Sequence, residues 1–163
     1  MARKVFFSFH FDNDFWRTNQ VRNIGVIEGK EPISSNDWEE VKRKGEESIK
    51  KWIDENLENK SCCIVLIGTE TSQRKWVQYE IKKAWEKGEG LIGIYIHNLK
   101  DENSNQAIKG RNPFNLFKIG EKNMADIVKV YDPPYQISTN VYDHIKNNIE
   151  NWVEEGITIR NKN

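Results

Sequence analysis

The sequence predicts an α/β fold in which helices cover both faces of a central parallel sheet of about five strands. Segments rich in β-branched and aromatic residues alternate along the chain with longer segments whose apolar residues recur every three or four positions. At least two of the strand-like segments are continuously apolar, which indicates that both of their faces are buried. This combination is typical of a three-layer, flavodoxin-like sandwich, and we expect residues 1–163 to form one domain.

Short apolar runs give the expected strands. They are KVFFSF (4–9), CCIVLIG (62–68), LIGIYIH (91–97) and IVKVYD (127–132), with a weaker GVI (25–27). We expect the polar residues from His10 to Asp14 to form a loop after the first strand. Cys62 and Cys63 are adjacent, so their side chains point to opposite faces of a strand and do not form a bridge; we assign both to the core.

Apolar periodicity predicts the helices. They run from Asp14 to about Gly25 and over residues 37–57, 73–87 and 139–155. Residues 98–125 follow no period and form a long polar connection. Connections of this length inside a compact domain are uncommon and tend to be functional or disordered.

Charge and composition exclude several classes of function. Lys+Arg and Asp+Glu are balanced at 25 each, so no overall field attracts nucleic acid or a lipid surface. No apolar run approaches the roughly 20 residues of a membrane helix, and the N-terminal apolar run is too short for a signal peptide. No cysteine has His or Cys partners at zinc spacing. We therefore expect a cytoplasmic protein without a metal.

Glu80 is the strongest candidate for a reactive group. At about 100° per residue, Val77, Ile81 and Ala84 fall within about 60° of one another and define the buried stripe of a helix. Glu80 falls about 60° from Val77 and Trp76 about 100° from it, on the same flank. A carboxylate at the edge of an apolar wall can act as a catalytic group. Acids in early helical turns are also common for structural reasons.

The order of the motifs resembles the TIR domain family over essentially the whole chain. VFFSFH (5–10) is similar to the first-strand signature of that family, and CCIVLIG followed by TETSQRKWVQYE (69–80) is similar to its central strand and W-x-x-x-E helix. Together with GRNPFN (110–115), these stretches are most similar to the TIR-like proteins of bacterial Thoeris anti-phage defence. The resemblance implies cleavage of the nicotinamide–ribose bond of NAD, and cyclisation of the remainder into an ADP-ribose signal that activates an effector without contact.

Under this resemblance Glu80 is the catalytic residue, and NAD is a substrate rather than a cofactor. The candidate substrate-binding residues are Ser8, Phe9, His10, Phe11, Asp12, Trp76, Asn112 and Phe114. Phe11 suits stacking on a ring, and His10 suits a phosphate or ribose contact, although a lone histidine at a strand end is as often structural. Trp76 suits either a wall of the pocket or support for its helix. No G-x-G-x-x-G turn occurs, so NAD would lie across the strand ends. Cyclisation would also require water to be excluded, and residues 98–125 are a candidate lid for that purpose.

Two other functions fit the same elements. A non-enzymatic TIR module would use the fold only to recruit partners or to self-associate, and the segment between the first helix and SSND (34–37) matches poorly the loop through which TIR domains commonly assemble. A nucleoside deoxyribosyltransferase-like enzyme would also place a carboxylate at the strand ends. The presence of Glu80 favours an enzyme, because a module that only binds partners does not need an acid at that position.

Overall fold

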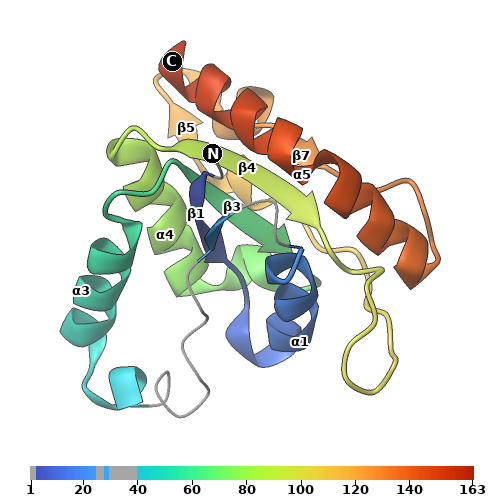
Figure 1. Ribbon diagram of the computed structural model, residues 1–163. Coiled ribbons are helices and arrows are strands. Elements are labelled where there is room, and N and C mark those ends of the chain that lie inside the picture. The colour runs from blue at the N-terminus through green and yellow to red at the C-terminus, as the bar shows by residue number, and fades with distance from the viewer. Residues whose placement is uncertain (1–2, 25–27, 30–39) are drawn as a thin grey trace.

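The predicted parallel sheet is confirmed. The computed structural model describes residues 3–24, 28–29 and 40–163 (Figure 1). Its five parallel strands lie in the order β2-β1-β3-β4-β7. Their bounds are Lys4–Ser8 for β1, Glu28–Gly29 for β2, Cys62–Ile67 for β3, Gly90–Tyr95 for β4 and Val130–Tyr131 for β7. The expected strand at 25–27 lies outside the described residues.

The centre of the sheet is buried on both faces, as the continuous apolar runs predict. Every residue of β3 and β4 is buried. Cys62 and Cys63 are free thiols that belong to the apolar clusters on opposite faces of the sheet. The assignment of both cysteines to the core is therefore confirmed.

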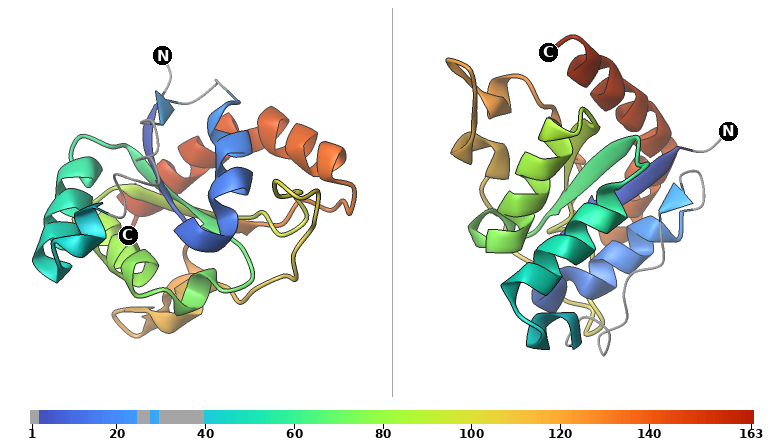
Figure 2. Two further views of the ribbon diagram at one scale, coloured as in Figure 1. Left: turned by 90° about the horizontal axis from the view of Figure 1, so that it is seen from below. Right: turned by 90° about the vertical axis from the view of Figure 1, so that its left-hand side faces the viewer.

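Helices cover both faces of the sheet. Helices α1 (Phe11–Arg22) and α5 (Ser138–Asn161) pack on one face, whereas α3 (Glu46–Leu57) and α4 (Lys75–Glu86) pack on the other (Figures 1 and 2). The closing helix runs six residues past the predicted end at Glu155, and its buried stripe continues to Gly156. These layers are those of the predicted three-layer sandwich.

The prediction of a loop from His10 to Asp14 is wrong. Helix α1 begins directly at Phe11, and His10 is its N-cap residue, with an extended backbone and no side-chain capping bond. Asp12 and Asp14 lie in the first turn, where carboxylates complement the positive end of the helix dipole. The polar residues that suggested a loop are therefore the first turn of a helix.

The prediction of one continuous helix over residues 37–57 is also wrong. Residues 37–39 lie outside the described part of the chain, and residues 40–43 are helical. Gly45 then has a φ of 98°, a conformation that side-chain-bearing residues rarely adopt, and α3 begins at Glu46. One apolar stripe therefore continues across two helical segments, which the glycine separates.

The polar connection after β4 contains several short elements. They are the 3₁₀ turns η2 (Pro113–Leu116) and η3 (Met124–Asp126) and the antiparallel ribbon of β5 (Lys118–Ile119) and β6 (Lys122–Asn123). Asn112 caps η2 by accepting a hydrogen bond from the Phe114 amide at 2.9 Å. The connection is therefore built from local capping and turn contacts rather than from an apolar period.

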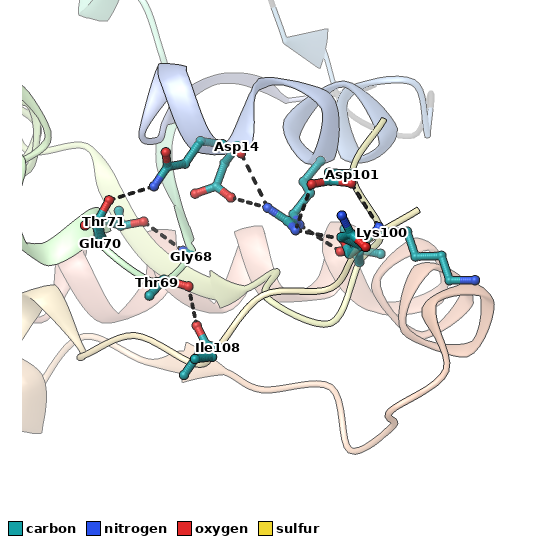
Figure 3. Close-up of polar contacts among 12 residues, drawn as sticks. Asp14, Gly68, Thr69, Glu70, Thr71, Lys100, Asp101 and Ile108 are labelled. Carbon is teal, nitrogen blue, oxygen red and sulfur yellow. Dashed lines mark hydrogen bonds and ion pairs between the residues drawn. The ribbon is translucent and has the colours of Figure 1, made fainter. Parts of the chain in front are cut away.

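A buried arginine of α1, which pairs with Asp14 of the same helix, attaches the start of this connection to α1 (Figure 3 labels Asp14). The Arg17 guanidinium donates to the carbonyl oxygens of Leu99 and Asn105 at 2.7 and 2.9 Å and to Asp14 Oδ1 at 2.9 Å. The Asp14 carboxylate lies over Gly68, where a Cβ atom would come within 2.1 Å of Oδ2. Any other residue at this position, directly after β3, would therefore require the buried Asp14 carboxylate to shift.

Candidate active site

Glu80 is a residue of α4, and its side chain reaches the end of β1. Its neighbours Val77, Ile81 and Ala84 are buried in the apolar cluster on that face of the sheet, and Glu80 itself is only 7% exposed. The hydroxyl of Ser8, the last residue of β1, donates a hydrogen bond of 2.7 Å to Glu80 Oε1. The angular position derived from the sequence therefore predicts the burial of Glu80, and the structure adds its hydrogen-bond partner.

Burial controls the ionisation of this carboxyl group. Removal from water raises the pKa of Glu80 to about 8, and the hydrogen bond from Ser8 acts in the opposite direction. A desolvated carboxyl group with a neutral donor keeps its proton more readily than an exposed one. The group can therefore exchange a proton near neutral pH, a property that marks candidate catalytic residues.

Glu80 forms part of the wall of a cavity of about 290 Å³ that follows β1 toward the start of α1. The lining residues are Val5, Phe6, Phe7, Phe9, His10, Phe11, Asp12, Arg22, Lys42, Trp52, Asn56, Lys60, Arg74, Lys75, Trp76, Val77 and Glu80. This volume is at the lower end of the range for small-molecule sites. The lining combines aromatic rings with positively charged side chains, which suits a ligand that has both flat rings and phosphate groups.

The residues that follow β1 and the first turn of α1 form one end of the cavity. The Phe9 and Phe11 rings stack with centroids 5.9 Å apart, and Phe15 continues the row at 4.9 Å from Phe11. His10 is 6% exposed, and its Nδ1 atom has no hydrogen-bond partner in the described structure. Burial and the nearby positive charge of Arg74 lower the pKa of His10. A neutral imidazole with one unused nitrogen therefore borders the cavity.

Trp76 contacts both the cavity and its own helix, and its role toward a substrate stays a prediction. It lines the cavity, and its ring packs edge-on against Tyr79 with centroids 5.8 Å apart. The Lys75 ammonium group lies 4.9 Å from the centre of the same ring. The indole is therefore a wall of the cavity that its own helix holds in place.

Six of the nine predicted site residues line this cavity: Phe9, His10, Phe11, Asp12, Trp76 and Glu80. Ser8 contacts it through Glu80. The structure does not bring Asn112 or Phe114 to the cavity. The Phe114 ring is fully buried in the core over Gly93, and the Asn112 side chain caps its own turn. None of the described residues of 98–125 lines the cavity, so the lid expectation gains no support here.

Sequence reasoning missed the side of the cavity formed by α3 and the start of α4. Trp52 and Asn56 lie one turn apart on α3, and Arg74 is the N-cap residue of α4. A polar residue one turn after a tryptophan on an otherwise apolar stripe is the pattern that could have revealed this wall.

In residues 3–24, 28–29 and 40–163, no three His, Cys, Asp or Glu side chains gather in a way that could hold a metal ion. No helix in the described part of the chain has the length and apolar character needed to cross a bilayer.

A parallel sheet of this order, with a buried carboxylate on the helix after the central strand, defines a TIR-like domain. Residues 6–101 match the family described as "Thoeris protein ThsB, TIR-like domain", and the chain belongs to this family. The matched region includes the last three residues of β1 and all of β3 and α4, and therefore both Ser8 and Glu80. The chain is also 42% identical, over 120 residues, to a protein of Bacillus cereus (strain MSX-D12) described as "Putative cyclic ADP-D-ribose synthase ThsB1". This match covers 70% of the chain but 62% of that protein's length.

Proposed function

We propose that this protein is an NAD-cleaving cyclase that releases nicotinamide and joins the remaining ADP-ribose into a cyclic signalling nucleotide. The observation that carries the proposal is Glu80, a buried carboxyl group that borders a ring- and phosphate-compatible cavity and accepts a hydrogen bond from Ser8. Membership of the Thoeris family and the name of the Bacillus cereus relative support this function.

The first step breaks the bond between the nicotinamide nitrogen and the anomeric carbon of the ribose. The bonding electron pair leaves with nicotinamide, and positive charge develops on the ribose ring, as in glycoside cleavage. An ionised Glu80 would stabilise this charge at close range in a site with little water. This role requires Glu80 to be ionised. Burial opposes ionisation because it raises the pKa of Glu80, whereas the Ser8 hydrogen bond favours the ionised form.

The second step determines whether the product is cyclic or linear. A nucleophilic atom of the same ADP-ribose unit forms the new bond to the anomeric carbon, and a hydroxyl nucleophile passes its proton to a base, for which Glu80 is the candidate. Attack by water would instead give linear ADP-ribose. Cyclisation requires the nucleophile to be held against the anomeric carbon while water is excluded. The aromatic rings of Phe9, Phe11 and Trp76 are suited to hold the substrate in such a folded form.

The biological role follows from the product. We propose that the cyclic nucleotide diffuses to an effector protein and activates it during phage infection, so that the two proteins communicate without contact. We also propose that residues 1–163 act as a single domain, since β1, β2, β3, β4 and β7 belong to one five-stranded sheet that draws on both ends of the chain.

The test is to incubate the protein with NAD, with and without lysate of phage-infected cells, and to follow nicotinamide and nucleotide products by chromatography and mass spectrometry. We expect nicotinamide and a cyclic product of lower mass than ADP-ribose by one water. Glu80→Gln should reduce nicotinamide release at least about 100-fold, the cost of removing one group that stabilises transition-state charge.

The matched control is Glu86→Gln, which makes the same change at an exposed position of the same helix and should leave the rate unchanged. Intact NAD under every condition would refute the enzyme and favour a TIR module that only binds partners. Linear ADP-ribose as the sole product would refute the cyclase. Exchange of bases on nucleosides, with NAD untouched, would identify a deoxyribosyltransferase-like enzyme.

A further inference from the structure

Arg74 is the N-cap residue of α4 and lines the cavity with Glu80. Its backbone amide bonds to Thr71 and its carbonyl oxygen accepts from Gln78, so the backbone of the cap is satisfied without the side chain. The guanidinium group has no carboxylate or hydrogen-bond partner among the described residues. A fixed charge with five donors therefore borders the cavity without a structural role there.

The other cavity-lining cations are already engaged. Lys75 forms an ion pair with Glu46 of α3. Arg22, Lys42 and Lys60 each have another interaction within the molecule. Two acidic residues, Asp12 and Glu80, also line the cavity. Asp12 is exposed to solvent, and burial favours the neutral, protonated form of Glu80. Arg74 is thus the cation whose charge is most available to a ligand.

The surroundings of Arg74 also favour an anion. It stands at the positive end of the α4 dipole, a helix of 12 residues. His10 lines the same cavity, is 94% buried, and has an Nδ1 atom without a hydrogen-bond partner among the described residues. An arginine fork, a helix N-terminus and a buried unpaired imidazole together form a site suited to phosphate.

The spacing along α4 places this anion site at a useful distance from Glu80. Glu80 follows Arg74 by six positions, which corresponds to about 9 Å along the helix axis. In a dinucleotide, one ribose and its 5′ oxygen separate the reacting anomeric carbon from the diphosphate. The two residues could therefore contact the two ends of one nicotinamide ribose.

We propose that Arg74 binds the diphosphate of the substrate, with His10 as a second donor, and so selects dinucleotides over nucleosides. This inference rests on the proposed function. It assigns Arg74 to substrate binding and leaves the reaction at the anomeric carbon to Glu80.

The experiment measures binding of NAD and ADP-ribose by calorimetry in the Glu80→Gln protein, which should not consume either ligand. Titrations are made at low and high salt. Arg74→Gln in this background should weaken ADP-ribose binding at least about tenfold at low salt, the size expected for a lost charged hydrogen bond. The difference should shrink at high salt, because ions screen the contact at the exposed mouth of the cavity.

Two further variants separate charge from structure. Arg74→Lys keeps the charge but loses the fork, so it should retain part of the affinity. Lys82→Gln removes a positive charge from an exposed position of the same helix and should bind both ligands within about twofold of its parent. Matching thermal unfolding curves of all variants would show that the fold is intact.

The outcomes for Arg74 and for the proposed function can be told apart. Unchanged ADP-ribose binding by Arg74→Gln, or an equal loss at both salt concentrations, overturns the role of Arg74 even if the wild-type protein releases nicotinamide. Failure of the Glu80→Gln protein to bind either ligand also overturns it. Binding of ADP-ribose that depends on Arg74, without nicotinamide release by the wild type, supports the diphosphate site and refutes the cyclase.

Discussion

The environment of Glu80 combines two opposing effects on one carboxyl group. Apolar neighbours on α4 and β1 remove it from water and raise its pKa to about 8, whereas the Ser8 hydroxyl stabilises the ionised form through a single neutral hydrogen bond. A nearby arginine would instead hold the carboxylate permanently ionised. The observed arrangement leaves the negative charge weakly stabilised in the free protein and available to a positively charged reaction centre.

Ser8→Ala should shift the pH dependence of catalysis. If the ionised carboxylate is the active form, kcat/KM should rise with pH in the wild type and level off above about 8. Loss of the Ser8 hydrogen bond should raise the pKa of Glu80 further, so the plateau should move to higher pH. The measurement is nicotinamide release from pH 6 to pH 10.

Ser8→Thr is the matched control, because it retains the hydroxyl and should keep most of the wild-type profile. An alanine variant whose profile coincides with that of the wild type would show that Ser8 does not control the ionisation of Glu80. A uniform loss of rate at every pH would indicate a purely structural role.

At the level of single residues, the sequence could reveal positions on a helix but not contacts between elements. The angle from Val77 identified Glu80 correctly as a residue at the edge of the core, since helical geometry is regular. The bond from Ser8 to Glu80 joins residues far apart in the chain and required the packing of α4 on β1. Phe114 stands in a polar stretch and was expected at the cleft, but its ring fills the space over Gly93.

At the level of elements, α1 links the first strand to the connection after β4. Arg17 is the central residue of this link, because its guanidinium group bonds to two backbone carbonyls of that connection and to Asp14. Both side chains of the Arg17–Asp14 pair are at most 5% exposed. A pair this deeply buried depends on both partners, since either charge alone would remain desolvated and uncompensated.

Arg17→Ala should therefore destabilise the protein by about 3–5 kcal/mol, the usual cost of breaking a buried ion pair from one side. The free energy of unfolding is measured by urea denaturation. Arg3→Ala is the matched control, because Arg3 pairs with Glu154 where both side chains are nearly half exposed, and it should change stability little. The Arg17→Ala, Asp14→Asn double variant should be less destabilised than the sum of the single changes. Equal effects of Arg17→Ala and Arg3→Ala would contradict the importance of this link.

Element boundaries were predictable only where the hydrophobic pattern determined them. The strands β3 and β4 were located within one or two residues, because their buried runs are continuous. The start of α1 was misplaced because His10 provides no capping side chain to mark it. The break at Gly45 was missed because the apolar stripe continues past it, while the break depends on the backbone conformation of one residue.

At the level of the whole molecule, the layer order followed from the alternation of strands and helices. The cavity did not, because side chains from β1, α1, α3 and α4 line it together. Periodicity describes one element at a time and does not show which residues of different elements face each other. Arg74 illustrates this limit, since only the assembled fold reveals that it lines the same cavity as His10 of the β1–α1 junction.

The buried Glu80 should also make stability depend on pH. The folded-state pKa of about 8 is above the ordinary value of 4.5, so folding is favoured while the group is protonated. Its contribution is fully present below pH 4.5 and is lost as the pH rises through 8. Glu80→Gln removes this dependence and keeps a group that can bond to Ser8.

The variant should therefore gain stability relative to the wild type as pH rises, by on the order of a few kcal/mol at pH 9 compared with pH 5. Urea denaturation of both proteins at each pH gives the difference. Comparing the two proteins cancels titration of all other groups. A difference that stays constant with pH would show that Glu80 ionises in the folded protein as readily as in the unfolded chain.

The strand order has a consequence for how the chain folds as it is synthesised. The first strand, β1, pairs along most of its length with β3, in a register that joins Val5 to Cys62. More than a third of the chain is therefore synthesised after β1 begins and before its partner β3 is available. The sheet face that α5 covers stays exposed until α5 has been synthesised, because that helix supplies much of the apolar cluster on this face. Pairings between distant segments form slowly and leave hydrophobic strands exposed in the meantime. The nascent apolar segment Val5–Phe7 is therefore expected to stay unpaired with its central partner until β3 has been synthesised.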